Sequence, residues 1–175
     1  MKKQEHGKQP NMDGINLLVS LLVCYQEISM VSFDPAQETL DLSFTLSEIP
    51  QRSSFETVTT VIIESIEAYH ALEHVSAAVL KLSLEAQGSL SFLHIIRDVD
   101  SLSRGEISLI VTLLQEYLGD VLLSDDSSDA APEAEEAVNA QEDIIDNIIG
   151  NLKINRVTER MVGIREEGRV MVFNK

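Results

Sequence analysis

Two stretches of alternating apolar and polar residues restrict the fold of this chain more than any other feature of its sequence. The first covers residues 39–46 and the second residues 80–84. A period of two places successive side chains on opposite faces of a strand, so each stretch predicts a β-strand with one buried face. The apolar positions are Leu40, Leu42, Phe44 and Leu46 in the first stretch and Leu80, Leu82 and Leu84 in the second.

Turn residues beside both stretches predict that each strand belongs to a hairpin. Asp34-Pro35-Ala36-Gln37 precedes the first stretch, and Gln87-Gly88 separates the second from residues 90–98. Proline suits such a turn because its φ is restricted, and glycine because it has no Cβ. Residues 90–98 are almost continuously apolar, which indicates burial on both faces. We expect a dimer contact or the C-terminal segment to cover the second face.

Three segments with apolar residues at helical spacing surround the hairpins and predict helices. Their apolar stripes are Ile15, Leu18, Leu22 and Tyr25; Phe55, Val58, Ile62, Ile66 and Tyr69; and Ile107, Ile110, Val111, Leu114 and Leu118. Residues that favour N-terminal caps stand at the start of each segment. The expected caps are Asp13 for the first helix, Ser53 or Ser54 with Glu56 for the second, and Ser103 with Glu106 for the third.

The order helix–hairpin–helix–hairpin–helix predicts an α+β fold. We expect two helix–β-hairpin units to form a four-stranded antiparallel sheet with helices packed on it, followed by a C-terminal helix and β-hairpin. A few identities between the units, at an offset of fifty residues, predict an internal αββ repeat. They are Ala36-Gln37 with Ala86-Gln87, Leu40 with Leu90, and Glu56 with Glu106.

The 175 residues divide into four parts by composition. Residues 1–11 are polar and rich in lysine, and we expect a flexible extension, with Met12 left open as the original start. Residues 12–123 contain the α+β domain. Residues 124–136 are acidic and too poor in apolar groups to offset the entropy of ordering, so they predict a linker. Residues 137–175 contain the last helix and a basic hairpin.

The apolar run Ile15–Cys24 follows several lysines and has the outline of an export signal. However, Val23 stands where a lipoprotein signal needs a small residue, and no Ala-x-Ala cleavage site follows. The run of ten residues is also too short to span a bilayer, so it predicts a core helix with Cys24 as a small core residue. A single cysteine cannot form an internal disulfide, which fits the cytoplasmic location that we expect.

The charge of the chain is large and unevenly distributed. The net charge is −16; residues 12–150 carry four basic and 25 acidic residues, whereas residues 151–175 carry six basic and three acidic residues. An acidic body repels phosphate backbones and anionic membranes. Aromatic residues make up 5% of the chain, which disfavours recognition by base stacking. The charge favours basic proteins, cations or the chain's own basic end as partners, or it serves solubility alone.

The C-terminal residues predict a hairpin with a compact turn at residues 165–168. Its strand residues are Met161, Ile164, Val170, Val172 and Phe173. Two strands alone are marginally stable in water, so the hairpin needs an apolar surface that receives it. Two alternatives stay open. The helix and hairpin fold back onto the domain or a dimer partner, or they form a detachable docking module for another macromolecule.

One short motif resembles a metal site. His70, Glu73 and His74 match H-x-x-E-H, in which two histidines on one helical face hold zinc and the glutamate activates water. The motif lies at the end of a predicted helix, and no further ligand motif follows it. We therefore expect an ordinary helix end, and neither a metal, a cofactor nor a catalytic residue.

A second group of acidic residues follows the predicted strand of residues 90–98. Asp98, Asp100 and Glu106 lack the regular ligand positions of an EF-hand, so they predict a capped loop instead of a calcium site. The sequence contains no Walker A, G-x-G-x-x-G or G-x-S-x-G motif, and no small-molecule substrate is identifiable.

We expect a non-catalytic protein-interaction or regulatory module, which binds another protein or itself through its sheet and C-terminal segment. One alternative is a nucleic-acid-binding accessory protein that uses the basic hairpin. Another is a small metal-dependent hydrolase at the H-x-x-E-H stretch. The expected interaction surface comprises Arg156, Arg160, Arg165, Arg169, Val170, Val172 and Phe173.

Overall fold

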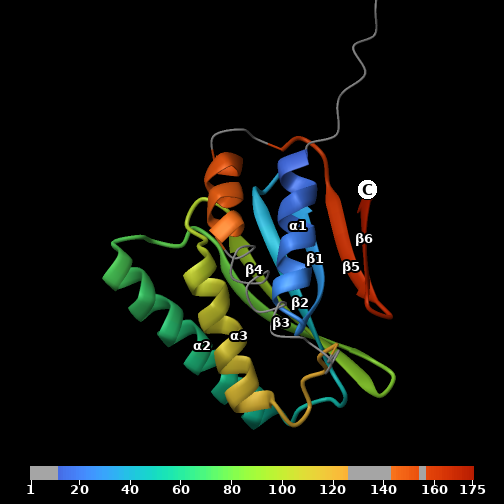
Figure 1. The fold of residues 1–175 in the computed structure, drawn as a ribbon. Coiled ribbons are helices and arrows are strands. Elements are labelled where there is room, and N and C mark those ends of the chain that lie inside the picture. The colour runs from blue at the N-terminus through green and yellow to red at the C-terminus, as the bar shows by residue number, and fades with distance from the viewer. Residues whose placement is uncertain (1–11, 126–142, 154–156) are drawn as a thin grey trace, which may run out of the picture.

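The computed structural model describes residues 12–125, 143–153 and 157–175. Within these residues six strands form one antiparallel sheet in the order β3-β4-β2-β1-β5-β6, and helices pack against it (Figure 1). The helices are α1 Met12–Cys24, α2 Arg52–Glu73, α3 Arg104–Leu118 and a C-terminal helix at 143–153. The strands are β1 Ile28–Asp34, β2 Thr39–Leu46, β3 Leu80–Gln87, β4 Leu90–Asp98, β5 Met161–Glu166 and β6 Arg169–Asn174. The predicted α+β class is confirmed.

The C-terminal hairpin belongs to the same sheet, so the predicted four-stranded sheet is too small. β5 lies antiparallel to β1, with Phe33 opposite Met161 and Met30 opposite Ile164, and β6 forms the outer edge. Figure 1 shows β5 and β6 beside β1, close to α1. An unpaired β1 would expose a row of backbone N–H and C=O groups, and an isolated hairpin is marginally stable. When the hairpin pairs with β1, the backbone groups of β1 are bonded and the hairpin gains the sheet as support.

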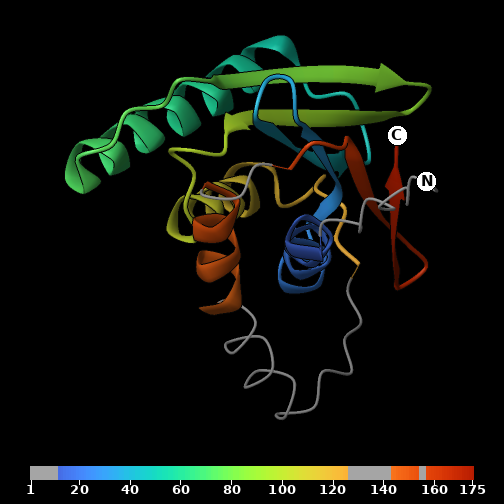
Figure 2. The same ribbon diagram turned by 90° about the horizontal axis from the view of Figure 1, so that it is seen from above.

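Helices cover one face of the sheet. Figure 2 places α1, α3 and the C-terminal helix on one side of the strands, and α2 packs against α3. The alternating apolar residues of the central strands form the core beneath them: Leu42 lies opposite Ile95 and Phe44 opposite Leu93, and none of the four is exposed. The helices contribute the predicted stripes, of which Val58, Ile62, Ile66, Ile107, Ile110, Val111, Leu114 and Leu118 are buried.

All three hairpin turns occur where the sequence predicts them. In the first, the Asp34 carboxylate accepts a hydrogen bond from the Ala36 amide at 2.9 Å. In the second, Gly88 has a φ of +63°. In the last, Glu167 and Gly168 have φ values of +50° and +73°, the pattern of a type I′ turn, which matches the twist of the flanking strands.

The predicted helix caps are confirmed only in part. The Ser103 side chain accepts from the Glu106 amide, as expected. The capping box of α2 is wrong, because the helix begins at Arg52 and Gln51 occupies the cap position without a side-chain hydrogen bond. Asp13 lies inside the first turn of α1, where its charge suits the helix dipole.

The predicted cover over β4 does not come from the C-terminal segment. β2 and β1 separate β4 from β5, so the C-terminal hairpin extends the sheet and does not lie across it. Phe92, His94 and Ile96, on the face of β4 away from the helices, are only half-buried. A dimer contact over this face stays a prediction.

The internal repeat also stays a prediction, although hairpins β1–β2 and β3–β4 meet through β2 and β4. The match of Leu40 with Leu90 does not join equivalent positions: Leu40 is buried under the helices, whereas Leu90 is 37% exposed. The extension at residues 1–11 and most of the linker at 124–136 lie outside the described residues. Among the described helices, none combines the length and apolar character needed to cross a membrane.

Candidate interaction surface

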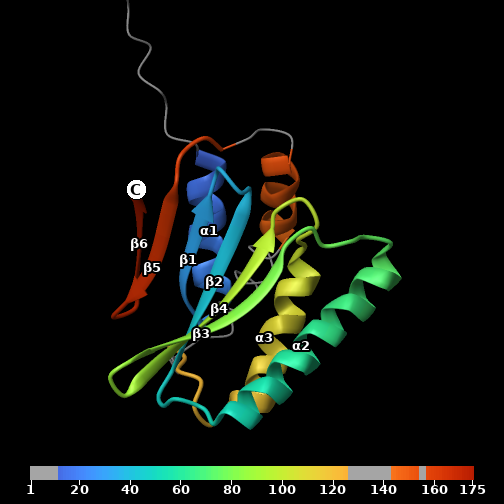
Figure 3. The same ribbon diagram turned by 180° about the vertical axis from the view of Figure 1, so that it is seen from behind.

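One face of the six-stranded sheet has no helical cover in the described part of the chain (Figure 3). We call it the open face. Its side chains alternate with the buried ones, because successive residues of a strand point to opposite sides. They include Lys81, Ser83 and Glu85 on β3, Phe92, His94 and Ile96 on β4, Asp41, Ser43 and Thr45 on β2, Met30 and Ser32 on β1, Val162 and Ile164 on β5, and Met171 and Phe173 on β6.

The β5–β6 end of the open face is apolar. Val162 lies opposite Phe173 and Ile164 opposite Met171, and Met30 on β1 continues the row. Phe173 is 50% exposed and Met171 is 37% exposed. We call these five residues the apolar end. Neighbouring large side chains that stay exposed to water are typical of a surface that binds another protein.

The centre of the open face is polar. His94 Nδ1 lies 3.1 Å from an Asp41 carboxylate oxygen and 3.0 Å from Ser43 Oγ. Burial raises the pKa of the Asp41 carboxyl, while the His94 and Ser43 contacts act in the opposite direction. The other ring nitrogen of His94, Nε2, is 3.7 Å from the Glu85 carboxylate. The imidazole therefore links β2, β3 and β4 across the sheet.

This trio contains the residue types of a serine hydrolase but not the arrangement. In a catalytic triad the nucleophile contacts one ring nitrogen and the acid contacts the other, so that the base accepts the hydroxyl proton on the far side from the acid. Here Ser43 and Asp41 contact the same atom, His94 Nδ1. Ser43 is also only 1% exposed. The cluster orders the polar centre and does not present an activated serine.

Arg97 is a buried cation that is missing from the residues predicted above. Its side chain has no exposed surface. The guanidinium binds the carboxylates of Glu106 and Asp98, its Nη2 donates to Ser101 Oγ at 2.9 Å, and Nη2 lies 3.3 Å from His70 Nε2. We call these five residues the buried cluster. Two of the three acids that the sequence assigned to a capped loop, Asp98 and Glu106, thus neutralise an arginine, whereas the third, Asp100, is exposed.

The buried cluster strongly lowers the pKa of one of its acids, Asp98. Burial acts to raise the pKa of Asp98, but hydrogen bonds from Ser101 and the Val79 amide, together with the Arg97 charge, outweigh burial and hold that pKa at about 2. A carboxylate held in this way is a permanent anion at neutral pH. It stabilises the loop that leads from β4 into α3 and is a poor general base.

The residues of the H-x-x-E-H stretch are not brought together. His70 is buried, with Nε2 2.7 Å from Glu106 Oε2. His74 is exposed and ends α2 with a φ of +56°, so it has left the helical face that the motif requires. Glu73 is exposed as well. No group of three or more His, Cys, Asp or Glu within the described ranges could hold a metal ion.

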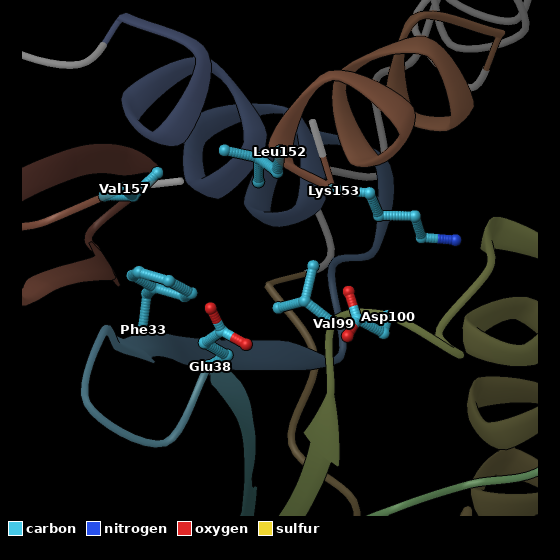
Figure 4. Close-up of a pocket in the computed structure, with 7 residues that line it drawn as sticks. All are labelled: Phe33, Glu38, Val99, Asp100, Leu152, Lys153 and Val157. Carbon is cyan, nitrogen blue, oxygen red and sulfur yellow. The ribbon is translucent and has the colours of Figure 1, made fainter. Parts of the chain in front are cut away.

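One partly enclosed pocket is small. Figure 4 shows it between the β1–β2 hairpin, which contributes Phe33 and Glu38, and the end of the C-terminal helix, which contributes Leu152 and Lys153. Its volume is about 40 Å³. Ligand pockets usually measure about 300 to 1,000 Å³, so this one has room for a water or two.

The predicted interaction residues divide between the two faces of the hairpin. Phe173 belongs to the apolar end, whereas Val170 and Val172 are half-buried against the core below. Arg169 is exposed at the turn. Arg156 lies outside the described residues.

Two other predicted cations bind groups of the same chain. Arg160 Nη2 lies 2.6 Å from an Asp34 carboxylate oxygen. The Arg165 guanidinium donates to the backbone carbonyls of Tyr25 and Gln26, which follow α1, and to that of Ile28, the first residue of β1. Burial lowers the pKa of Arg165, and the charges of Asp125 and Glu27 oppose this. Arg165 therefore binds the connection between α1 and β1, a role that the sequence alone did not indicate.

The described residues thus contain an open sheet face with an apolar end, and no constellation of activated side chains was found among them. Comparisons with protein-family models, with curated proteins and with solved structures gave no match.

Proposed function

We propose that this chain is a non-catalytic protein-interaction module, whose working surface is the open face of the sheet. The observation that carries the proposal is the apolar end, where Met171 and Phe173 project from an edge strand and remain exposed. These side chains bring the binding energy that buried aromatic and methionine residues typically supply to an interface.

The hairpin that carries the apolar end is itself well anchored. β5 pairs with β1, and Met161 at its start is 2% exposed beneath the sheet. The backbone of Gly163 approaches α1 so closely that an added Cβ would lie 3.0 Å from a Leu22 methyl group. A firmly held strand presents its outward side chains without a large ordering cost on binding. This supports docking of a partner onto the hairpin in place.

The charge of the chain suggests the chemistry of that partner. Residues 12–150 carry a large excess of acid, so the long-range field attracts basic proteins and repels nucleic acids. The proposed partner combines an apolar patch, which meets Met171 and Phe173, with surrounding lysine or arginine. Such a contact weakens as the salt concentration rises, because mobile ions screen the exposed charges.

The two rival functions draw little support from side-chain positions. A nucleic-acid site needs free cations, but Arg160 binds Asp34 and Arg165 binds backbone carbonyls of the α1–β1 connection. A metal-dependent hydrolase needs His70 and His74 on one face of a helix, but His70 is buried and His74 is exposed beyond the end of α2. We therefore favour the interaction module over both.

The proposal is tested by site-specific photocrosslinking in the full chain, in cells that make the protein. A benzophenone amino acid replaces Phe173 in one sample and Leu72, which is 79% exposed on α2, in the matched control. We expect a discrete adduct from position 173 that is absent from position 72. Mass spectrometry identifies the crosslinked protein, which is then purified.

Binding of the purified partner gives the decisive measurement. Met171→Asp is expected to weaken binding at least tenfold, because the substitution places a charge in the centre of an apolar contact. Arg52→Gln, which changes a side chain on α2 that is 92% exposed, should leave binding within twofold. Equal adducts at positions 173 and 72, or a partner that binds Met171→Asp normally, would show that the open face is not the working surface.

A further inference from the structure

The sheet ends in two edge strands, β3 and β6, and neither has a second partner strand among the described residues. Edge strands expose backbone donors and acceptors that another strand can bind. Which side chains an added strand meets depends on which residues point their backbone groups outward.

The direction of the β3 backbone follows from one hydrogen bond. The Asp98 amide on β4 donates to the Val79 carbonyl at 3.2 Å, just before the first residue of β3. Backbone groups alternate along an antiparallel strand, so odd-numbered residues of β3 bond to β4 and even-numbered residues point outward. Leu80, Leu82, Leu84 and Ala86 therefore carry the free edge.

We propose that two copies of the chain associate through β3, in an antiparallel pair centred on Ser83 of each copy. In this register Leu82 lies opposite Leu84 of the second copy, and Lys81 lies opposite Glu85 of the second copy. Two-fold symmetry repeats both contacts. The leucines meet on the helix-covered side, where they are already half-buried, and the two ion pairs form on the open face.

The charges select this register over its neighbours. The outward backbone groups of the two copies can bond only if even-numbered residues lie opposite even-numbered residues. The allowed registers therefore differ by two residues in pairing, which moves the residue at the two-fold axis by one position. Centring on Leu82 places Lys81 opposite Ser83, and centring on Leu84 places Lys81 opposite Gln87. Only the Ser83-centred register opposes Lys81 and Glu85, and opposite charges across a strand pair are stabilising.

The other edge lacks this complementarity. The Lys175 amide donates to the Arg160 carbonyl at 2.8 Å, so odd-numbered residues of β6 face β5 and even-numbered residues point outward. Arg169 is the one charged residue within the bounds of β6, so no register of two β6 strands places opposite charges across the pair. Of the two edges, β3 is therefore the one whose charges favour a second copy of itself.

A hollow beside the start of β3 receives the end of the added strand. It has a volume of about 530 Å³, and small residues of α2 and the 75–80 segment line part of it: Ala71, Ser76 and Ala77. In the proposed register Gln87 of the second copy lies opposite Val79. The turn that follows, Gly88-Ser89, then lies at this hollow, where its small residues fit.

This inference goes beyond the proposed function, because it concerns the β3 edge and names a second copy as the occupant. The two can fail separately. The photocrosslink at position 173 reports on the open face, whereas the experiments below report only on β3.

The first experiment measures self-association of the full chain by sedimentation equilibrium. Lys81→Glu and Glu85→Lys are each expected to weaken the dimer about tenfold, because each places two pairs of like charges across the interface. The double variant Lys81→Glu/Glu85→Lys restores the ion pairs and the dimer. Mixing the two single variants also restores them, in a heterodimer. Arg169→Glu makes the same charge change on β6 and should alter the dissociation constant less than twofold.

The second experiment tests the register directly, in a Cys24→Ala background that leaves one thiol per chain. Symmetric residues at a non-hydrogen-bonded pair have Cα atoms about 4.5 Å apart, close enough for a disulfide. Ser83→Cys is therefore expected to form a covalent dimer under mild oxidation. Lys81→Cys is the matched control, since the two copies of position 81 lie four residues apart along the pair and cannot meet.

The results decide the proposal in either direction. Restoration by the double variant and selective crosslinking of Ser83→Cys support it. A chain that stays monomeric overturns it, and so does a dimer that ignores both charge reversals. Equal crosslinking of Ser83→Cys and Lys81→Cys also overturns it, because random collision would then explain the disulfide.

Discussion

Arg97 on β4 and Glu106 on α3 form an ion pair in which neither side chain has any exposed surface. Arg97 Nη2 lies 3.0 Å from Glu106 Oε2, and the same oxygen is 2.7 Å from His70 on α2. One carboxylate thus joins a central strand to two helices. Two charges removed from water are costly unless each finds its partners, so the members of this cluster depend on one another.

Removal of one member of the Arg97–Glu106 pair is expected to destabilise the fold strongly. Glu106→Ala leaves the Arg97 cation buried with only Asp98 as a counter-ion, and we expect a loss of about 3 to 5 kcal/mol in the free energy of unfolding. Arg97→Met/Glu106→Leu removes both charges and should cost much less than the sum of the single changes. Urea denaturation of the singles and the double gives the coupling energy.

An exposed ion pair of similar chemistry supplies the control. Arg52 and Glu56, one turn apart on α2, lie 2.9 Å from each other and are 92% and 63% exposed. Glu56→Ala should cost less than about 0.5 kcal/mol, because water screens such pairs. Equal losses from Glu56→Ala and Glu106→Ala would show that the buried pair has no special role.

The pH dependence of the free energy of unfolding should reveal the lowered pKa of Asp98. Its pKa is about 2 in the folded chain, below the ordinary value of 3.8. A depressed pKa means that the unfolded chain binds the proton more readily, so the stabilisation is present above pH 4 and is lost as the pH falls toward 2. The shift corresponds to about 2 kcal/mol.

Asp98→Asn is therefore expected to lower the free energy of unfolding by about 2 kcal/mol at pH 6. The difference from the unaltered chain should shrink below pH 4 and nearly vanish at pH 2. Urea titrations at intervals of half a pH unit measure it. A difference that stays constant over this range would mean that Asp98 ionises normally.

Arg165 should stabilise the junction between α1 and the C-terminal hairpin. Its guanidinium donates to three carbonyls between the end of α1 and the start of β1, including that of Gln26 at 2.6 Å. Arg165→Met keeps much of the side-chain volume but leaves these carbonyls without their donor, and we expect a loss of about 2 kcal/mol. Arg169→Met, at the exposed turn, should change stability by less than about 0.5 kcal/mol.

The same variants test the nucleic-acid alternative. If the basic hairpin bound RNA, Arg169→Met would weaken that binding, although it leaves the fold intact. We expect the full chain to bind RNA only weakly at physiological salt, with no difference between the two variants. Filter binding at several salt concentrations provides the measurement.

Hydrogen exchange should find the C-terminal segment protected within a single chain. Ile149, on the buried side of the C-terminal helix, and Met161, at the start of β5, are each 2% exposed. Ile149→Ala and Met161→Ala should each cost about 2 to 4 kcal/mol. Their effect on exchange should reach β1, because β5 bonds to it. Rapid exchange of β5 amides at concentrations below any self-association would contradict docking within one chain.

Local patterns predicted most of the secondary structure. The alternation of Leu40, Leu42, Phe44 and Leu46 and the helical spacing of Ile107, Ile110 and Leu114 depend only on neighbours in the chain. Ser103 was likewise recognisable as a cap, because it bonds three residues ahead. The prediction for α2 failed at its first turn, where the Arg52–Glu56 pair lies within a helix that begins earlier than the serines suggest.

One further pattern in the sequence indicates the buried cluster. Leu93, Ile95 and Arg97 follow each other at a period of two, so Arg97 occupies a position that faces the core. A charge at such a position requires a partner. The sequence does not say which of many acids it is, and Glu106 and His70 come from two different helices.

The sequence alone determined which segments become helices and strands, which face of each is apolar, and that the last hairpin needs a receiving surface. Tertiary structure decided that β1 receives it, that Arg165 binds the α1–β1 connection and that Arg97 is neutralised by Glu106 and Asp98. The division has a physical cause. Periodicity and turn chemistry act between residues close in the chain, whereas these contacts join residues that only the packed arrangement of the sheet and helices brings together.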